Sequence, residues 1–484
     1  MTTALVIAVA GVLFTGLLGF LGSRGRVRDL ENWSVGGRNL GAAAMWFLQA
    51  GETFTTFTFL GTTGLTFVAV GAASYAIPYI CIAVIGGYFL GPRVWELGRS
   101  RGYLTQADFL SDRFGSRPLG VVAALVAILS LLPYLQLQMT GLGLIVQLLT
   151  GSSAGRIGSM VLAFVVTVLF VLRSGVRGVV TAAYFKDVIM VVVLAVIMVA
   201  VPLHFHLSYA DATHAIAARN PATLAVPFGE HTHAWYFSSM LISSIGVLFL
   251  TFPHQWPGLL AARDARALRR NYVFMPVYNL LAAIPMVIAL IGVVVLDRTS
   301  DGDSVLLTLA ARALPEWLVG FVLVAAAATA MVPAAVLTLA MSTLVANNVV
   351  RARGERTRLR VNHATAVVVT ALSLLFGILR PDLLANLLLL TFSGLTQLAP
   401  AIGLALPARR VVGAPAITTG LVLGIATVVA TTAADVTIDH VDNGVLGLAV
   451  NLVAVAAVEA TTRLLRRDPA RQPAADAAPT GTAR

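Results

Sequence analysis

The chain has 484 residues, of which 58% are hydrophobic and 11% are charged, and its mean hydropathy is +0.87. Soluble proteins carry about 25% charged residues, so this composition excludes an ordinary soluble protein and predicts a helical membrane protein. The net charge of +11 does not indicate nucleic-acid binding, because the arginines stand at the ends of apolar stretches and form no basic stripe interleaved with aromatic residues. The single cysteine, Cys81, excludes an intrachain disulfide and a thiolate metal cluster.

Apolar stretches long enough to cross a bilayer recur along the chain, and we predict a helix for each. In chain order they cover residues 3–22, 41–67, 71–96, 119–149, 157–173, 178–203, 234–258, 272–296, 317–350, 361–379, 383–406, 415–432 and 444–462. The first has no basic residue before it and no small-residue cleavage site after it, so we expect a retained helix and not a signal peptide. Residues 463–484 are rich in Pro, Ala and Asp, which predicts a disordered tail.

Basic residues are distributed unevenly between the two sides of this alternation. Of the 33 Lys and Arg residues, 28 fall in alternate connections and in the C-terminal tail, and Lys186 is counted among them. The opposite side holds Arg156, Arg219, Arg298, Arg312 and Arg380. Cationic residues near helix ends are retained in the cytoplasm, so we expect the N-terminus outside and the C-terminus inside, with anionic lipid headgroups beside the arginines.

The second stretch contains an acid, Glu52, about a third of the way along it. An ionisable group at that depth is costly and is by default a functional residue. The glycines around it, from Gly51 to Gly64, favour an interrupted helix whose free amides would bind a substrate carboxylate, with Thr53 and Thr56 adding their hydroxyls. The alternative is a water-accessible acid near the inner interface, paired with a cytoplasmic arginine.

The seventh stretch contains a second set of helix-breaking residues. Pro253 and Pro257 follow Ser244 and predict another interrupted helix, five stretches after the first. That separation is expected for corresponding helices of two inverted repeats. His254 is a candidate for substrate binding or proton relay, and the alternative is a histidine that caps carbonyls freed at the proline break.

Polar residues in three other stretches are weaker candidates. Gln136 and Gln138 either line a polar path or form a hydrogen bond between helices. Gln397 belongs to a polar cluster in the eleventh stretch that would suit a gate. Ser342 and Thr343 are expected to hydrogen-bond back to their own helix.

The longest outer connection, between residues 204 and 233, contains five of the eight histidines. Two His-x-His pairs make metal binding an alternative, but no cysteine lies near them, and we expect interfacial histidines in a flexible loop without a metal. The five are His204, His206, His214, His231 and His233.

Several segments resemble the solute:sodium symporter family. ENWSVGGRNLG followed by WFLQAGETFTTFTFLGTTGL is similar to the start of that family, and GPRVWELGRSRGYLTQADFLSDRFGS resembles its first large cytoplasmic loop. FPHQWPGLLAARDARALRRNYVFMPVY and MVPAAVLTLAMSTLVANNVV are most similar to its bacterial monocarboxylate permease branch. The similarity runs from about Glu31 to Val350.

This resemblance implies an all-α membrane protein of thirteen transmembrane helices with a leucine-transporter-type inverted repeat. Residues 1–22 would be a first extra helix, residues 41–203 and 234–406 the two five-helix repeats, and residues 415–462 two C-terminal helices. It also implies alternating access, with the substrate near the midplane between the second and seventh helices.

The resemblance further implies a sodium site. The carbonyls of Gly51, Phe54 and Thr329 would bind the ion together with two adjacent hydroxyl side chains. The positions that should supply those hydroxyls are Val332 and Pro333. Pro333 does free the Thr329 carbonyl, but hard cations prefer several oxygen ligands, so sodium coupling at this site is disfavoured.

We therefore predict a secondary transporter of the plasma membrane that imports a small organic solute, with a monocarboxylate favoured. Glu52 can bind a proton at almost the depth of the sodium site, so the proton is favoured over sodium as the coupling ion. One alternative is a sodium-coupled carrier of amino acids or other small solutes, in which Glu52 would bind an ammonium group. A channel or a membrane sensor is a more remote alternative. Neither an enzymatic motif, a cofactor site nor an obligatory protein partner is evident.

Overall fold

The computed structural model describes residues 2–22, 29–150, 153–297, 301–380 and 382–467. These residues form helices, with three isolated β-bridges and no strand among them, so the prediction of an all-helical protein is confirmed. Residues 468–484, which make up most of the tail predicted to be disordered, lie outside the described residues.

Every predicted apolar stretch is helical over most of its length. The first half of the chain contains α1 (Thr2–Leu21), α3 (Ala42–Thr53), a π-helical turn (Phe57–Gly61), α4 (Thr62–Val68), α5 (Val70–Ala73), α6 (Ala76–Arg101), α8 (Arg117–Thr150) and α9 (Ser153–Phe205). The second half contains α11 (His233–Leu248), α12 (Gln255–Ala261), α13 (Ala265–Asn279), α14 (Ala283–Val295), α16 (Glu316–Leu344), α17 (Glu355–Leu379), α18 (Leu384–Leu395), α19 (Ala399–Ala405), α20 (Ala414–Ala433) and α21 (Asn443–Arg467).

Ten helices in the described part of the chain are long and apolar enough to cross a membrane. The predicted stretches outside these ten are the second, the fifth and the seventh. The second and seventh are each broken into shorter helices, α3 with α4 and α11 with α12. Each half of a broken stretch is by itself too short to cross a membrane as a helix. Both halves together are as long as a membrane helix.

The fifth and sixth stretches meet at Gly175 without the predicted loop. Gly175 has φ 53° and ψ −145° inside α9, which therefore consists of two helices, residues 153–174 and 176–205. A Cβ on Gly175 would lie 2.2 Å from the carbonyl oxygen of Trp33. Both the positive φ and this close approach require glycine.

Four helices lie in segments that we predicted as connections: α2 (Leu30–Val35), α7 (Gln106–Phe114), α10 (Tyr209–Arg219) and α15 (Val305–Ala313). The prediction of a flexible loop for residues 204–233 was wrong, because α10 begins there with a Ser208 cap on the Asp211 amide. His204, His214 and His233 lie in α9, α10 and α11. Among the described residues, no group of three His, Cys, Asp or Glu side chains could hold a metal ion.

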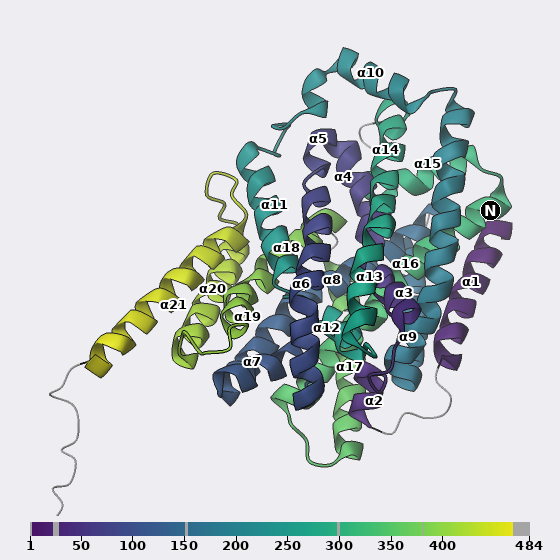
Figure 1. The fold of residues 1–484 in the computed structure, drawn as a ribbon. Helices are drawn as coiled ribbons and strands as arrows, with labels where there is room; N and C mark the ends of the chain where they lie inside the picture. Colours follow the sequence, from purple (N-terminus) through teal and green to yellow (C-terminus); the bar gives the residue numbers. More distant parts are fainter. Residues whose placement is uncertain (1, 23–28, 151–152, 298–300, 381, 468–484) are drawn as a thin grey trace, which may run out of the picture.

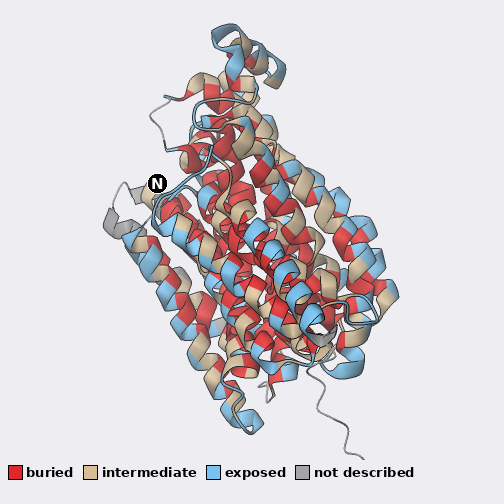
Figure 2. Cartoon of the chain, turned by 90° about the vertical axis from the view of Figure 1, so that its left-hand side faces the viewer, coloured by how far each residue is buried: buried red, intermediate tan, exposed pale blue. Residues whose placement is uncertain are grey.

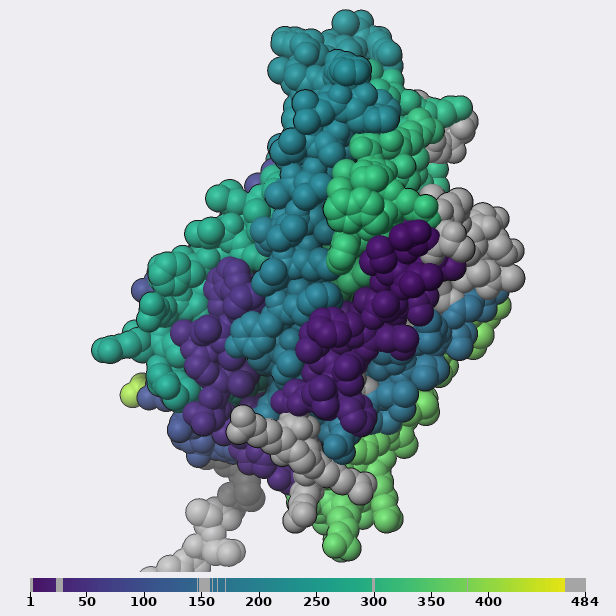
Figure 3. Space-filling view, turned by 90° about the vertical axis from the view of Figure 1, so that its right-hand side faces the viewer, coloured from purple at the N-terminus to yellow at the C-terminus, as the bar shows by residue number. Residues whose placement is uncertain are grey.

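The helices form a bundle with α10 at one end and α2, α7 and the start of α17 at the other (Figure 1). Buried residues concentrate where the helices meet, and exposed residues mark their outward faces (Figure 2). α16 lies in the interior, and each of its residues from Val322 to Leu344 is buried. α1 lies along α9 on the outside (Figure 3) and exposes Val6, Leu13 and Leu17, as expected of a helix that faces lipid.

The predicted inner connections come together at one end of the bundle. The Arg38 guanidinium donates to the Tyr103 carbonyl at 2.8 Å, and that of Arg99 donates to the Arg263 carbonyl at 2.7 Å. Lys186 is the exception. Its side chain, which α9 carries, is fully buried, so Lys186 does not belong to the basic residues that we counted on the inner side.

Asp108 joins one of these connections to the π-helical turn Val345–Val349 at the end of the ninth stretch, and this arrangement leads to a stability prediction. Its carboxylate accepts the Leu104 and Thr105 amides at 2.9 and 3.1 Å and the side-chain amides of Asn347 and Asn348 at 2.8 and 2.7 Å. Asp108→Ala leaves these donors without an acceptor, so we expect a loss of about 2–4 kcal/mol in the free energy of unfolding. Thermal unfolding of the purified protein would measure it.

The matched control is Asp264→Ala, which removes an N-cap of α13 that is exposed to solvent and accepts the Ala267 amide at 2.7 Å. We expect a clearly smaller loss for this variant. Equal effects of the two substitutions would show that the Asp108 network contributes no more than a helix cap.

Candidate functional site

The first helix break lies within the predicted segment between Gly51 and Gly64, three residues after Gly51. α3 ends at Thr53, and Phe54 adopts φ −92° and ψ 91°. Gln138 of α8 compensates for the helix hydrogen bonding that is lost at this break. Its side-chain oxygen accepts hydrogen bonds from the Thr56 hydroxyl at 2.7 Å and from the Thr56 amide at 3.4 Å. The break is therefore maintained by a neighbouring helix.

The second break spans residues 249–254, between α11 and α12, where the prolines predicted it. Leu250 has φ 54°, and its carbonyl accepts the Trp256 indole N–H at 2.8 Å. The Gly246 carbonyl accepts the Thr251 amide at 3.0 Å and the Thr251 hydroxyl at 2.9 Å. The side chains of Trp256 and Thr251 thus donate hydrogen bonds to carbonyl oxygens at this break. His254 makes no such capping bond with the described residues.

A cavity of about 50 Å³ lies between the two breaks. Its polar lining combines an acid and threonines from the first break with a histidine and a glutamine from the second. Aromatic rings form much of the rest: the lining includes Glu52, Thr53, Thr55, Thr58, Tyr79, Tyr134, Phe252, His254, Gln255 and Phe392.

Glu52 and His254 face this cavity without hydrogen-bond partners. Glu52 is 4% exposed and His254 is 3% exposed. Neither Glu52 carboxylate oxygen, nor Nδ1 of His254, has a partner among the described residues. Buried polar groups are normally paired, so these atoms are available to a ligand or a proton.

The remaining candidates for substrate binding lie away from this cavity. Thr56 is bonded to Gln138, the Gln136 side-chain amide donates to the Arg380 carbonyl at 2.7 Å, and the Gln397 side-chain amide donates to the Gly444 carbonyl at 3.0 Å. Ser244 is buried on α11 and does not line the cavity.

A buried cation lies beside the carbonyl at the predicted sodium site. The Lys186 ammonium is 3.3 Å from the Gly51 carbonyl and 2.8 Å from Oδ1 of Asp187, and lies 5.8 Å from the centre of the Phe54 ring. The Tyr278 hydroxyl donates to the same Asp187 oxygen at 2.8 Å. Lys186 is 0% and Asp187 2% exposed.

Of the α16 residues predicted for this site, Val332 and Pro333 have no side-chain oxygen to offer a cation. A Cβ on Gly51 would lie 3.5 Å from a methyl of Val332, which places these two residues together as predicted. The Thr329 hydroxyl donates to the Ala326 carbonyl of its own helix at 2.7 Å, and Pro333 is buried within α16. Ser342 and Thr343 bond back to Leu339, as predicted.

Our sequence analysis missed Lys186 and Asp187 because it assigned Lys186 to a cytoplasmic connection. A signal was available, since Lys186 is the only lysine of the chain and stands next to an acid inside an apolar stretch.

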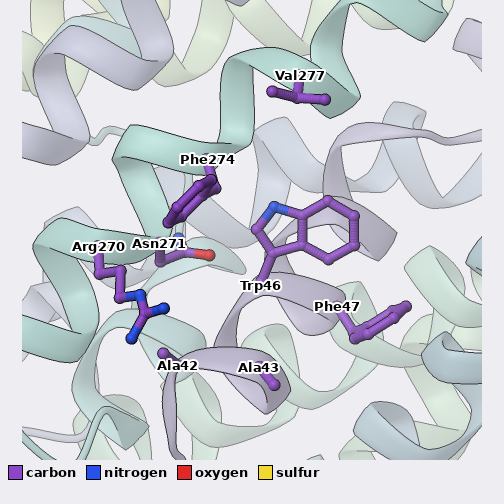
Figure 4. Close-up of a pocket in the computed structure, with 8 residues that line it drawn as sticks. All are labelled: Ala42, Ala43, Trp46, Phe47, Arg270, Asn271, Phe274 and Val277. Carbon is purple, nitrogen blue, oxygen red and sulfur yellow. The ribbon is translucent and has the colours of Figure 1, made fainter.

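A larger pocket of about 480 Å³ lies between α3 and α13 (Figure 4). Trp46 lies between Phe274 and Phe47 in this pocket, and Arg270 lies at its edge. Its lining is mostly apolar, and Phe274 is 51% exposed. The pocket is therefore an open groove, and neither Glu52 nor Lys186 lines it.

Hydrogen bonds separate this groove from the Glu52 carboxylate. Asn271 lines the groove and donates to the Gln49 side-chain oxygen. The Gln49 side-chain amide in turn donates to the Tyr272 hydroxyl at 3.2 Å. Gln49 and Tyr272 line a second cavity, of about 40 Å³, that also includes Glu52.

Asp303, at the opposite end of the bundle, makes stability pH-dependent. It packs against Gly64 of α4, and its Oδ2 accepts the Leu384 amide at 3.0 Å. Burial, with a smaller contribution from the nearby Asp301 and Asp382, raises the pKa of Asp303 to about 7 against the lowering effect of the Leu384 amide.

Because the folded protein binds this proton more tightly than the unfolded chain, the stabilisation is complete below about pH 4 and is lost as the pH rises through 7. We expect Asp303→Asn to be more stable than the wild type by roughly 4 kcal/mol at pH 8, and the two proteins to converge at low pH. Thermal unfolding at several pH values would measure the difference. A constant difference across that range would contradict the titration of Asp303.

The model of the sodium:solute symporter family matches residues 33–424. The chain belongs to the sodium:solute symporter family. A Bacillus subtilis protein described as an uncharacterized symporter, YhjB, is 31% identical over 494 aligned positions that cover 98% of this chain and all of that protein. A monocarboxylate transport permease protein of Rhizobium johnstonii is 26% identical over 355 positions, which cover 72% of this chain and 70% of that protein.

Solved structures agree on the fold of this symporter-family member. The chain is similar to an outward-open structure of a Na⁺-coupled sialic acid symporter, with a TM-score of 0.72 at 14% identity over 95% of this chain and 98% of that chain. It also resembles Mhp1, a nucleobase-cation-symport-1 transporter, with a TM-score of 0.57 at 14% identity over 89% and 94% of the two chains. The protein is thus a multi-pass membrane transporter and not an enzyme.

Proposed function

We propose that this protein imports a small monocarboxylate together with protons across the plasma membrane. The observation that carries the proposal is the Glu52 carboxylate, which is buried in a cavity between two broken helices and has no hydrogen-bond partner in the part of the chain that the structure describes. An ionised Glu52 would repel the carboxylate of a substrate, whereas a protonated Glu52 can donate a hydrogen bond to it. Proton and substrate then bind together, which is the thermodynamic requirement for symport.

The proposed topology follows from the arginine pattern and the family. It has thirteen crossings, an outer N-terminus, a cytoplasmic C-terminus, and two inverted repeats over residues 41–203 and 234–406. In that arrangement α3 with α4 and α11 with α12 are the first helices of the two repeats, and the substrate lies where both are broken.

The inner route proposed for the substrate passes the Gln49–Asn271 hydrogen bond. That bond and the Tyr272 hydroxyl stand between the Glu52 carboxylate and the groove of Figure 4, which lies towards the arginine-rich end of α13. Breaking these bonds while the outer side closes would give alternating access.

A carrier of amino acids is the second candidate. The cavity combines the Glu52 carboxylate with the rings of Tyr79, Tyr134, Phe252 and Phe392. An acid and aromatic faces together suit an ammonium group. In that case Glu52 would remain ionised and would bind the substrate directly.

Uptake into proteoliposomes tests both candidates. Labelled acetate, lactate, pyruvate and alanine would be offered under a proton gradient without sodium and under a sodium gradient at constant pH. One pH unit is worth about 1.4 kcal/mol per proton, so a 1:1 symporter should accumulate a monocarboxylate about tenfold. Sodium-driven accumulation without a pH response would contradict the proposal, and a preference for alanine would favour the second candidate.

A further inference from the structure

We propose that the Lys186 ammonium is a tethered cation that takes the place of the coupling sodium ion, so that Lys186 sets the ion specificity of this transporter. Only the uptake measurement described below depends on the proposed transport function; the other tests of this inference do not. Its structural basis is the hydrogen bond of 3.3 Å from the ammonium to the Gly51 carbonyl, next to the broken end of α3.

The ammonium is bound where a small cation would be bound. A carbonyl oxygen of α3, a carboxylate oxygen of α9 and the face of the Phe54 ring surround it. Carbonyl and carboxylate oxygens are ligands of hard metal cations, and an aromatic face also attracts a cation. The site thus has the ligands of a cation. The cation that occupies it is the side-chain ammonium of Lys186, a residue of α9.

Charge balance leaves no need for a second cation. Lys186 and Asp187 neutralise each other, and the Tyr278 hydroxyl gives the same Asp187 oxygen a further hydrogen bond. A sodium ion added here would lie close to the ammonium in a medium of low dielectric constant, where repulsion between like charges is strong. Asp187 cannot offset two positive charges.

The residues opposite the pair do not replace the missing oxygen ligands. A Cβ on Gly51 would meet the Ala183 methyl at 3.2 Å and the Val332 methyl at 3.5 Å. Apart from Oδ2 of Asp187, which belongs to the ion pair itself and would lie 3.9 Å away, these neighbours are hydrocarbon. Pro333 adds neither a hydroxyl nor an amide N–H. The loss of the hydroxyl ligands and the presence of the ammonium are therefore two independent departures from a sodium site at one place.

The experiment compares sodium with choline at constant ionic strength on the purified full-length protein. We expect no sodium-specific change in the melting temperature of the wild type. Lys186→Ala/Val332→Ser/Pro333→Ser removes the ammonium and supplies two hydroxyls, so we expect a sodium-specific rise in its melting temperature. We also expect its uptake to become at least about fivefold faster with sodium, as coupling energies of this size allow.

Val332→Ser/Pro333→Ser is the matched control, because it supplies the hydroxyls and keeps the ammonium. We expect this variant to remain insensitive to sodium. Sodium-specific stabilisation of the wild type or of this control would overturn the inference, and so would a folded triple variant that does not respond to sodium.

A second measurement decides the question if the triple variant does not fold. Lys186 is the only lysine of the chain, so an amine-reactive reagent followed by mass spectrometry reports on this one side chain. We expect sodium to leave its modification rate unchanged in the wild type, and a sodium-dependent rate would overturn the inference. The melting temperature and the modification rate can both be measured without a transported substrate. A failure of the proposed function can therefore be distinguished from a failure of this inference.

Discussion

Lys186→Met is expected to lower the free energy of unfolding by about 3–5 kcal/mol, because it leaves Asp187 charged and buried without its counterion. Asp187 is only 2% exposed, and the Tyr278 hydroxyl, at 2.8 Å, is then the partner that remains to it. Thermal unfolding in detergent should show this as a fall in Tm of roughly 5 °C.

Lys186→Met/Asp187→Asn tests the physical reason. This double variant removes both charges and keeps an oxygen that can accept the Tyr278 hydroxyl, so most of the stability should return. If the double variant is less stable than Lys186→Met, the loss comes from packing and the pair is not electrostatically coupled. The exposed pair Arg101 and Asp112 is the matched surface control, and breaking it should change stability by less than about 1 kcal/mol.

Glu52→Gln is expected to abolish proton-driven accumulation of substrate while exchange of labelled for unlabelled substrate continues. Glutamine resembles the protonated acid in shape and can still donate a hydrogen bond, but it cannot release a proton. Net uptake should therefore fall at least about tenfold and lose its pH dependence, since the energy of a proton gradient of one unit is no longer coupled. Uptake and counterflow in proteoliposomes would measure the two rates.

Glu96→Gln is the control, because Glu96 is an exposed acid near the end of α6. It should keep both net uptake and exchange. If Glu52→Gln instead loses all substrate binding and alanine is the transported solute of the wild type, Glu52 binds an ammonium group and the second candidate function is correct.

Local features of the chain were sufficient to predict the helices. Whether a stretch is long and apolar enough to form a membrane helix depends only on residues that are neighbours in the sequence. Each predicted stretch therefore coincides with helix over most of its length in the structure. The prolines around residue 254 predicted the second break because a proline removes a helix hydrogen bond wherever it lies. The family was also recognisable from motifs alone, and residues 33–424 match its model.

The position of the first break could not be predicted in this way. The glycines predicted an interruption between Gly51 and Gly64, and it lies at Phe54, where Gln138 of α8 bonds both the hydroxyl and the amide of Thr56. Gln138 is more than eighty positions away along the chain. A hydrogen bond between distant helices decides which turn of a glycine-rich segment opens, and sequence spacing does not contain that information.

The sequence by itself determined that this chain is a helical membrane transporter and that its second and seventh stretches are broken, and it predicted that Val332 and Pro333 stand where the resemblance implies the hydroxyls of a sodium site. Only the tertiary structure placed Lys186 beside the Gly51 carbonyl. The physical reason is that a lysine inside an apolar stretch can be surrounded by water or by a buried carboxylate, and only the packing of the helices shows which of the two it meets.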